Sequence, residues 1–204
     1  MKNNPPAWLY RRPRILNILN ALWLASPHSQ MNAIEKACLQ KHAAGKKLAL
    51  EIGTYMGVTA TIIAGAMHKE GKLYCVDPFE LKNGEENPGY LMAIRELKRS
   101  NGLAKTTFLR GFSTSKEIID QVPEQLDFIL VDGDHSYEGL ANDWQIVLDK
   151  LSTNGIVCLH DTTIPAAEPY RNFGSVTYFN EVVKIDKNFT LLETVYSMNV
   201  LLRK

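Results

Sequence analysis

Acidic and histidine side chains follow two apolar segments of this sequence, and side chains of these types can hold a cation or move a proton. The segments are residues 128–131 (FILV) and 156–159 (IVCL). The candidates that follow them are Asp132, Asp134, His135, His160 and Asp161. Carboxylates gathered at one place are costly unless a cation or substrate neutralises them. A set rich in oxygen ligands, with few imidazoles, favours Mg²⁺, Mn²⁺ or Ca²⁺ over zinc.

Part of this set has a simpler structural explanation. Asp134 and Ser136 stand directly before a predicted helix, where short polar side chains are typical caps, and we assign them that role. His160 also fits a histidine that is hydrogen-bonded within the fold. We expect Asp132, His135 and Asp161 to carry function.

A glycine-containing segment, residues 51–57 (EIGTYMG), leads from a predicted strand into a helix. Glycines at such a point let the backbone approach a ligand and leave helix N–H groups free to bind it. The spacing is E-x-G-x-x-x-G and lacks the middle glycine of the dinucleotide fingerprint G-x-G-x-x-G. A strand-to-helix turn that requires glycines for its own geometry explains the pattern equally simply.

Asp77 ends the next predicted strand, 20 residues after Gly57. A carboxylate at that place can accept both hydroxyls of a ribose, although an Asp before proline is also a common turn residue. We favour the ribose role because the glycine segment accompanies it. After the third strand, Phe112 offers an aromatic face and Ser113 a hydroxyl where an adenine would lie.

The elements that must position these residues alternate along the chain. Predicted strands cover residues 48–52, 72–76, 107–110, 126–131, 155–159, 190–195 and 198–203. Predicted helices cover residues 32–44, 58–69, 91–101, 114–121, 137–151 and 176–185. Apolar strands separated by helices indicate a parallel sheet covered on both faces. The two-residue link 196–197 permits a hairpin, so the last strand should be antiparallel.

The N-terminal residues 1–45 are predicted to form a helical cover for a domain that spans residues 46–204. Six apolar side chains fall on one helical face, with Pro13 near the first turn; they are Ile15, Leu16, Ile18, Leu19, Leu22 and Trp23. We expect that face to pack on the domain. The charged and apolar residues 11–25 also resemble an export signal, but Asn17 and Asn20 interrupt the apolar run.

Composition narrows the class of protein. The 204 residues suit a single domain or little more. Lys and Arg total 23 and Asp and Glu total 22, a net charge of +1, which offers no bulk field for nucleic acid or an anionic membrane. The three cysteines have no C-x-x-C spacing, and two lie in apolar runs, which favours buried thiols and a cytoplasmic location.

Taken together, these segments resemble the class I S-adenosylmethionine-dependent methyltransferases. The similar branch is that of catechol O-methyltransferase and of the metal-dependent sugar O-methyltransferases. The segments that carry the resemblance are LALEIGTYMG, LYCVDPF, TFLRGFS, DFILVDGDHSYEG and GIVCLHDTT, which extend over most of the chain. The resemblance implies a Rossmann-like, doubly wound α/β fold with a seven-stranded, mostly parallel sheet and an antiparallel last strand.

The resemblance also assigns roles to single residues. It implies cofactor contacts for Glu51, Gly53, Thr54, Gly57, Asp77, Phe112, Ser113 and Asp132. It implies metal ligands at Asp132, Asp161 and Thr162, where Thr162 departs from the Asn or Asp that is frequent in the family. It implies that His135 is the catalytic base, acting beside Asp132.

The expected reaction is methyl transfer from S-adenosylmethionine to a hydroxyl of a small phenolic or sugar-bearing molecule. A divalent ion would lower the pKa of that hydroxyl, and His135 would take its proton. Three alternatives remain: an NAD-dependent oxidoreductase, a metal-dependent hydrolase, and a non-catalytic domain that binds the cofactor beside another chain.

The motifs do not identify the methyl acceptor. Aromatic candidates for an acceptor pocket are Tyr55, Phe79, Tyr90, Trp144, Tyr170 and Phe173, and Arg171 lies in the same 163–173 loop. Each of these side chains is equally typical of core packing. The apolar N-terminal helix favours a homodimer.

Overall fold

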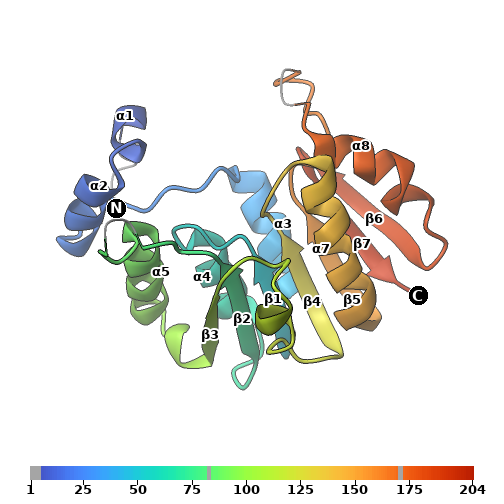
Figure 1. Cartoon of the computed structure of the whole chain (residues 1–204), viewed down its shortest axis with the longest axis horizontal. Coiled ribbons are helices and arrows are strands. Elements are labelled where there is room, and N and C mark those ends of the chain that lie inside the picture. Colours follow the sequence, from blue (N-terminus) through green and yellow to red (C-terminus); the bar gives the residue numbers. More distant parts are fainter. Residues whose placement is uncertain (1–5, 82–83, 170–171) are drawn as a thin grey trace.

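A seven-stranded sheet forms the centre of the molecule (Figure 1). The computed structural model describes residues 6–81, 84–169 and 172–204. The strands are β1 (Leu48–Ile52), β2 (Lys72–Asp77), β3 (Thr106–Arg110), β4 (Leu126–Val131), β5 (Leu151–Leu159), β6 (Phe189–Val195) and β7 (Met198–Arg203). Their order is β3-β2-β1-β4-β5-β7-β6. β7 pairs antiparallel with both neighbours, whereas the pairs among the first five strands are parallel. The predicted fold class is therefore confirmed.

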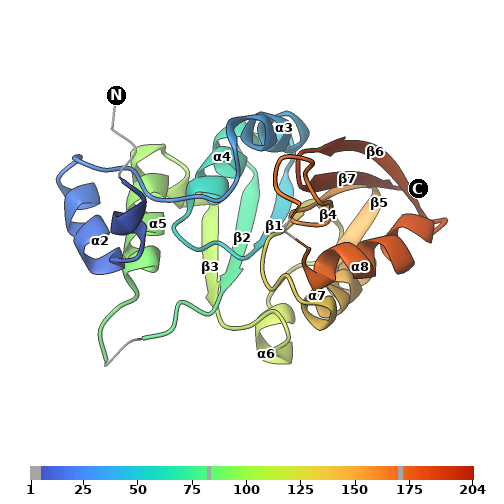
Figure 2. The same ribbon diagram turned by 90° about the horizontal axis from the view of Figure 1, so that it is seen from above.

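Helices cover both faces of the sheet (Figure 2). The helices of the described residues are α1 (Ala7–Tyr10), α2 (Pro13–Ala21), α3 (Ala33–Ala43), α4 (Val58–Ala66), α5 (Pro88–Arg99), α6 (Lys116–Ile119), α7 (Tyr137–Lys150) and α8 (Gly174–Glu181), with short 3₁₀ turns η1 (Leu103–Lys105) and η2 (Val183–Ile185). Of these, α1 and α2 lie outside α5 rather than on the sheet. No helix in these described ranges is long and apolar enough to cross a membrane.

The core consists of two large clusters because each central strand is apolar on both faces. On β4, Phe128 and Leu130 pack in the cluster with α3, α4 and α5. Ile129 and Val131 point to the opposite face and pack with α7 and α8. Alternation of this kind explains why the strands appear in the sequence as continuous apolar runs.

Several element boundaries differ from the prediction. β5 begins at Leu151 rather than at residue 155, because Leu151 already pairs with Leu126 before a register shift. α4 ends at Ala66 rather than at residue 69, since the following Met67 is extended. The predicted helix 176–185 is divided into α8 and η2.

The N-terminal helix α2 packs differently from the expectation. Leu16 is fully buried and forms a small third cluster with Leu9, Ala25, Met56 and Met92. Most of the predicted packing face is exposed instead: Ile15, Ile18, Leu22 and Trp23 are among the exposed large hydrophobic residues. The prediction that this whole face packs on the domain is therefore wrong.

A polar contact takes the place of that apolar face. Asn20, which interrupts the apolar run in the sequence, is fully buried. Its Nδ2 donates to Glu96 Oε1 at 2.8 Å, and its Oδ1 accepts from Arg95 at 2.7 Å. α2 is thus held on α5 by satisfied polar groups, a pattern that apolar periodicity does not detect.

Candidate active site

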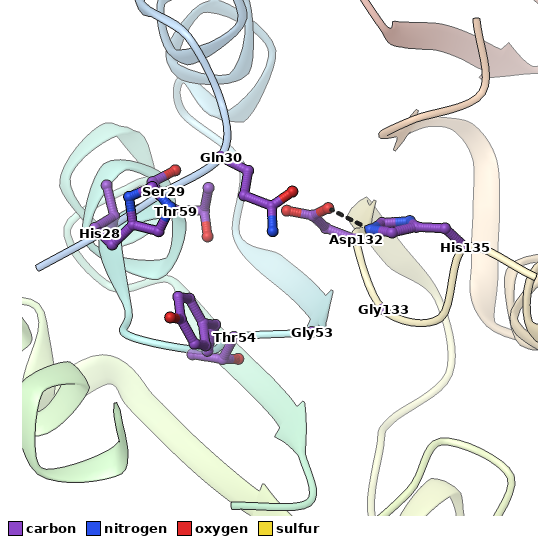
Figure 3. Close-up of a pocket in the computed structure, with 11 residues that line it drawn as sticks. His28, Ser29, Gln30, Gly53, Thr54, Thr59, Asp132, Gly133 and His135 are labelled. Carbon is purple, nitrogen blue, oxygen red and sulfur yellow. Dashed lines mark ion pairs between the residues drawn. The ribbon is translucent and has the colours of Figure 1, made fainter. Parts of the chain in front are cut away.

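Two adjoining cavities lie at the carboxyl ends of the parallel strands. The larger, of about 360 Å³, is lined by Ile52, Gly53, Tyr55, Val76, Asp77, Pro78, Gly111, Phe112, Ser113, Asp132, Gly133 and Asp134. The smaller, of about 170 Å³, is lined by His28, Ser29, Gln30, Gly53, Thr54, Tyr55, Val58, Thr59, Asp132, Gly133 and His135 (Figure 3). Most of the predicted site residues lie here. Open parallel sheets bind their ligands at this edge.

The two glycines of the 51–57 segment are required by the fold. Gly53 has φ +89°, and a Cβ atom on it would lie 2.1 Å from the backbone oxygen of Asp132. Gly57 has φ +75°, and its Cβ would lie 2.6 Å from Cα of Ala93 in α5. Gly53 lines both cavities, whereas Gly57 shapes the turn into α4 by close packing. The structural explanation thus holds for both glycines, and Gly53 also faces the candidate ligand space.

Two buried polar atoms beside the smaller cavity lack partners. Among the described residues, neither Oε1 of Glu51 nor Oγ1 of Thr54 has a hydrogen-bond partner. Glu51 is fully buried on β1, and this burial raises its pKa to about 7, although the nearby Thr59, Thr54 and Cys75 side chains act to lower it. Buried polar groups are nearly always paired, so these two unpaired atoms fit a site that is completed by a polar ligand.

Asp77 is held by the backbone around the larger cavity. Its Oδ2 accepts from Tyr55 N at 2.8 Å, and its Oδ1 accepts from Phe79 N at 2.9 Å. Both contacts are those of a turn residue, and they fix the carboxylate at the cavity wall. Each oxygen keeps a further lone pair that could accept from a ligand hydroxyl.

The two predicted adenine contacts, Phe112 and Ser113, differ in how free they are to meet a ligand. Phe112 is 58% exposed and offers its ring to the larger cavity. Ser113 lines the same cavity, but its hydroxyl donates to Asp143 Oδ1 at 2.6 Å. Burial raises the pKa of Asp143 to about 6, a shift that the Ser113 hydrogen bond opposes. The Ser113 proton is therefore committed to Asp143, and the oxygen is left as an acceptor.

Acidic and imidazole groups from β4 and β5 converge as the sequence predicts. His135 Nε2 lies 3.6 Å from Asp161 Oδ2 and 4.0 Å from Asp132 Oδ1. His160 Nδ1 lies 2.8 Å from Asp132 Oδ1 and 3.6 Å from Asp161 Oδ2. Asp161 and His160 are buried, while the side chain of His135 is partly open to the smaller cavity. His160 thus has the within-fold role that the sequence left open.

Glu35 of α3 extends this cluster away from the cavity. It is fully buried, and its Oε1 lies 3.5 Å from His160 Nε2. Burial alone would raise the pKa of Glu35, but hydrogen bonds from His160 and Ser197 and one from Asn32 lower it to about 2. Burial alone would lower the pKa of His160, but Asp132, Glu35 and Asp161 raise it to about 10.

The family of the chain follows from comparison with known proteins. A family model described as a methyltransferase domain matches residues 50–162, which is more than half of the chain. The chain belongs to this methyltransferase family. No curated protein sequence matches it.

Solved structures agree in fold with this methyltransferase. The O-methyltransferase from Bacillus cereus in complex with SAH has a TM-score of 0.67 and 17% identity, over 98% of this chain and 92% of that chain. TomG from Streptomyces achromogenes, an O-methyltransferase of tomaymycin synthesis in complex with SAM, has a TM-score of 0.66 and 14% identity, over 98% and 92%. SAH-bound PaMTH1 from Podospora anserina has a TM-score of 0.66 and 16% identity, over 100% and 90%. These likenesses establish the class I methyltransferase fold.

Sequence reasoning missed several site residues of the methyltransferase. His28, Ser29 and Gln30 precede α3 and line the smaller cavity, with Gln30 pointing toward Asp132 (Figure 3). No motif marks this loop. Asn32 and Glu35 have the spacing of a capping box, and the structure contains that box. The spacing predicts a helix start, but it does not indicate which residues the second carboxylate oxygen of Glu35 contacts.

Two polar residues near the site have their hydroxyls engaged. Ser136 caps α7, as predicted, by accepting from Gly139 N at 2.9 Å, and Asp134 accepts from Ser136. The Thr162 hydroxyl donates to Leu159 O at 2.8 Å and accepts from Asn199 Nδ2 at 2.9 Å. This geometry argues against Thr162 as a metal ligand.

The aromatic candidates are distributed between core and cavity. Trp144 is buried and packs against Phe189, so it belongs to the core. Phe173 lies against His135, with ring centroids 5.4 Å apart. Tyr55 lines both cavities. Tyr170 and Arg171 lie outside the described residues.

Proposed function

We propose that this methyltransferase transfers a methyl group from S-adenosylmethionine to a hydroxyl oxygen of a small molecule. The observation that carries the proposal is the pair of joined cavities, with Asp77 at one end and the His135–Asp161 pair at the other. The nucleoside and the reacting hydroxyl would then lie on the two sides of Gly53 and Asp132, which both cavities share.

The residues present fit this cofactor. Asp77 would accept from the ribose hydroxyls, and Phe112 would lie against the adenine. The unpaired atoms of Glu51 and Thr54 would meet the charged amino-acid portion, because a carboxylate and a hydroxyl can satisfy an ammonium. Bound S-adenosylmethionine supplies a methyl group on a positively charged sulfur, so the chemistry requires mainly alignment of the acceptor oxygen.

The protein must also remove the proton of the acceptor hydroxyl. The His135 ring would take it, and the Asp161 carboxylate, 3.6 Å from Nε2, would stabilise the imidazolium that forms. The oxygen forms its bond to the methyl carbon as the carbon–sulfur bond breaks. The bonding electron pair stays on sulfur, and S-adenosylhomocysteine is the product.

Assistance by a divalent metal is a separate hypothesis. Asp132 and Asp161 are the carboxylates that would hold Mg²⁺, but both lie against His160, and the Thr162 hydroxyl is engaged elsewhere. Among the described residues, three metal-ligating side chains converge within 4.8 Å only at Cys38, His42 and Glu193, a group far along α3 where Lys41 already pairs with Glu193. The observed donor set falls short of a Mg²⁺ site, so no step is assigned to a metal.

Calorimetric titration with S-adenosylhomocysteine, with NADH as the control ligand, tests the cofactor assignment. We expect binding of the former, loss of it in Asp77→Ala, and none of the latter. Methyl transfer to a panel of phenols and sugar hydroxyls, measured with and without EDTA, tests the reaction and the metal. Full activity in His135→Ala would remove the base role. Absence of S-adenosylhomocysteine binding by folded protein would overturn the proposal.

Two coarser inferences accompany the function. The acceptor is a small molecule, because the cavities have volumes of only about 170 and 360 Å³ and the net charge of +1 gives no field for nucleic acid. The location is cytoplasmic, since Cys38, Cys75 and Cys158 are all free and buried.

A further inference from the structure

Glu35 makes more contacts than a helix cap requires. The capping box needs only the hydrogen bond from Asn32 N to Glu35 Oε2, at 2.9 Å. The other oxygen, Oε1, accepts from Ser197 N at 3.1 Å and from Ser197 Oγ at 2.7 Å, and it faces His160 Nε2. Capping residues usually remain at the surface, whereas Glu35 is completely buried. Its second oxygen therefore serves the interior of the molecule.

Burying this charge is costly unless partners compensate it. Three donors and the His160 ring surround the Glu35 carboxylate. The opposite nitrogen of His160, Nδ1, lies 2.8 Å from Asp132 Oδ1 and forms an ion pair with it, although the contact does not have hydrogen-bond geometry. The imidazole thus bridges two carboxylates, one anchored in α3 and one at the wall of both cavities.

The same contacts tie the end of β5 to α3. Ser197 lies in the turn between β6 and β7, and its backbone oxygen accepts from Thr162 N at 2.9 Å and Thr163 N at 3.1 Å. Since Ser197 also donates twice to Glu35, one carboxylate fixes both His160 and the turn behind it. Displacing Glu35 would loosen both His160, which contacts the Asp132 side chain, and the turn that holds Thr162 and Thr163.

We propose that Glu35 is a positioning residue for the reaction: through His160 it holds the Asp132 carboxylate in place at the cavity. This role rests on the proposed function, because the position of Asp132 affects methyl transfer only if the reaction takes place in these cavities. Glu35 does not touch the cavities and acts only through its neighbours. Helix α3, which lies within the predicted N-terminal cover, thereby also supports the position of Asp132.

Glu35→Gln tests this role, because glutamine keeps the size and one acceptor oxygen but removes the charge. Glu193→Gln is the matched control: it makes the same chemical change in an ion pair that anchors the other end of α3, through Lys41 at 2.7 Å and His42 at 2.5 Å. Three properties are compared with wild type: the crystal structure, the affinity for S-adenosylhomocysteine, and the rate of methyl transfer to an acceptor found in the panel.

In Glu35→Gln we expect the His160–Asp132 contact to break and the transfer rate at saturating cofactor to fall about ten- to a hundredfold, because a displacement of about 1 Å at a reacting centre can cost about a hundredfold in rate. Affinity for S-adenosylhomocysteine should fall much less than the rate, because Glu51 and Asp77 keep their positions and Asp132 is only one of the implied cofactor contacts. Glu193→Gln should match wild type in all three properties. If Glu35 has only a structural role, Glu35→Gln should lower the stability of the protein and change the transfer rate and the cofactor affinity to the same extent.

An unmoved Asp132 in Glu35→Gln, or a wild-type rate, would overturn the inference. A wild type that binds no S-adenosylhomocysteine would instead overturn the proposed function, while the crystal structure of Glu35→Gln would still decide whether Glu35 positions Asp132. If Glu35→Gln does not fold, Ser197→Ala decides by the same criteria, since it removes the hydroxyl that contacts both Glu35 and His160.

Discussion

At the scale of single residues, Glu51 is the group whose ionisation should respond most directly to ligand. It is fully buried with one oxygen unpaired, and burial raises its pKa to about 7. A ligand ammonium beside it would favour the charged form and lower that pKa. Below about pH 7 the free protein holds a proton on Glu51 that it must release on binding.

The affinity for S-adenosylhomocysteine should therefore rise as the pH increases toward about 7. It should fall again above about pH 8, where an α-amino group loses its own proton. Calorimetry in buffers with different ionisation enthalpies measures the proton released. Glu51→Gln should remove the acidic limb and leave the alkaline one. A pH-independent affinity between pH 5 and 7 in the wild type would exclude contact between Glu51 and the ammonium.

At the scale of elements, the turn from β1 into α4 is defined by backbone that only glycine tolerates. Gly53→Ala should lower the free energy of unfolding by at least about 2 kcal/mol, since a Cβ would clash with a backbone oxygen at positive φ. Gly65→Ala is the control. Gly65 lies inside α4, a Cβ there would meet nothing within 4 Å, and alanine should stabilise the helix by about 0.5–1 kcal/mol.

Urea denaturation of the two variants measures both values. Equal stabilities would mean that the 51–57 turn adjusts freely, and the structural explanation of Gly53 would then be wrong. If Gly53→Ala folds but no longer binds S-adenosylhomocysteine, the glycine is also needed to let the ligand approach the backbone of this turn.

The same scale shows what the sequence could and could not predict. Central strands such as β1 and β4 were predicted residue for residue, because continuous apolar runs between helices leave little alternative. The convergence of Asp132, His135 and Asp161 followed from topology, since parallel strands end at one edge. Glu35 could not be placed, because its contact with His160 joins residues 125 positions apart through a packing arrangement that no local pattern encodes.

At the scale of the whole molecule, the N-terminal segment has two different surfaces. One packs on α5 through Leu16 and the buried Asn20. The other exposes large apolar side chains to solvent, namely Trp8, Ile15, Ile18, Leu22 and Leu24. Trp23 is also exposed, but the guanidinium group of Arg99 in α5 lies over its ring, 3.9 Å from the centroid. Periodicity identified the apolar residues but not the direction in which they point, because the buried contact is polar. Exposed large apolar side chains gathered on one short segment are typical of a protein interface.

We therefore expect a homodimer through this surface of α1 and α2, with a second copy as the partner. In a two-fold interface each substitution acts twice, so one charge placed in the surface should be enough to separate the copies. Light scattering coupled to size exclusion should give twice 23.0 kDa for the wild type and 23.0 kDa for Leu22→Asp. Ile185→Asp is the control, because Ile185 is 70% exposed in η2, away from this segment, whereas Leu22 is 62% exposed. A monomeric wild type at micromolar concentration, or a dimeric Leu22→Asp, would mean that the exposed apolar side chains of α1 and α2 do not join two copies of the chain.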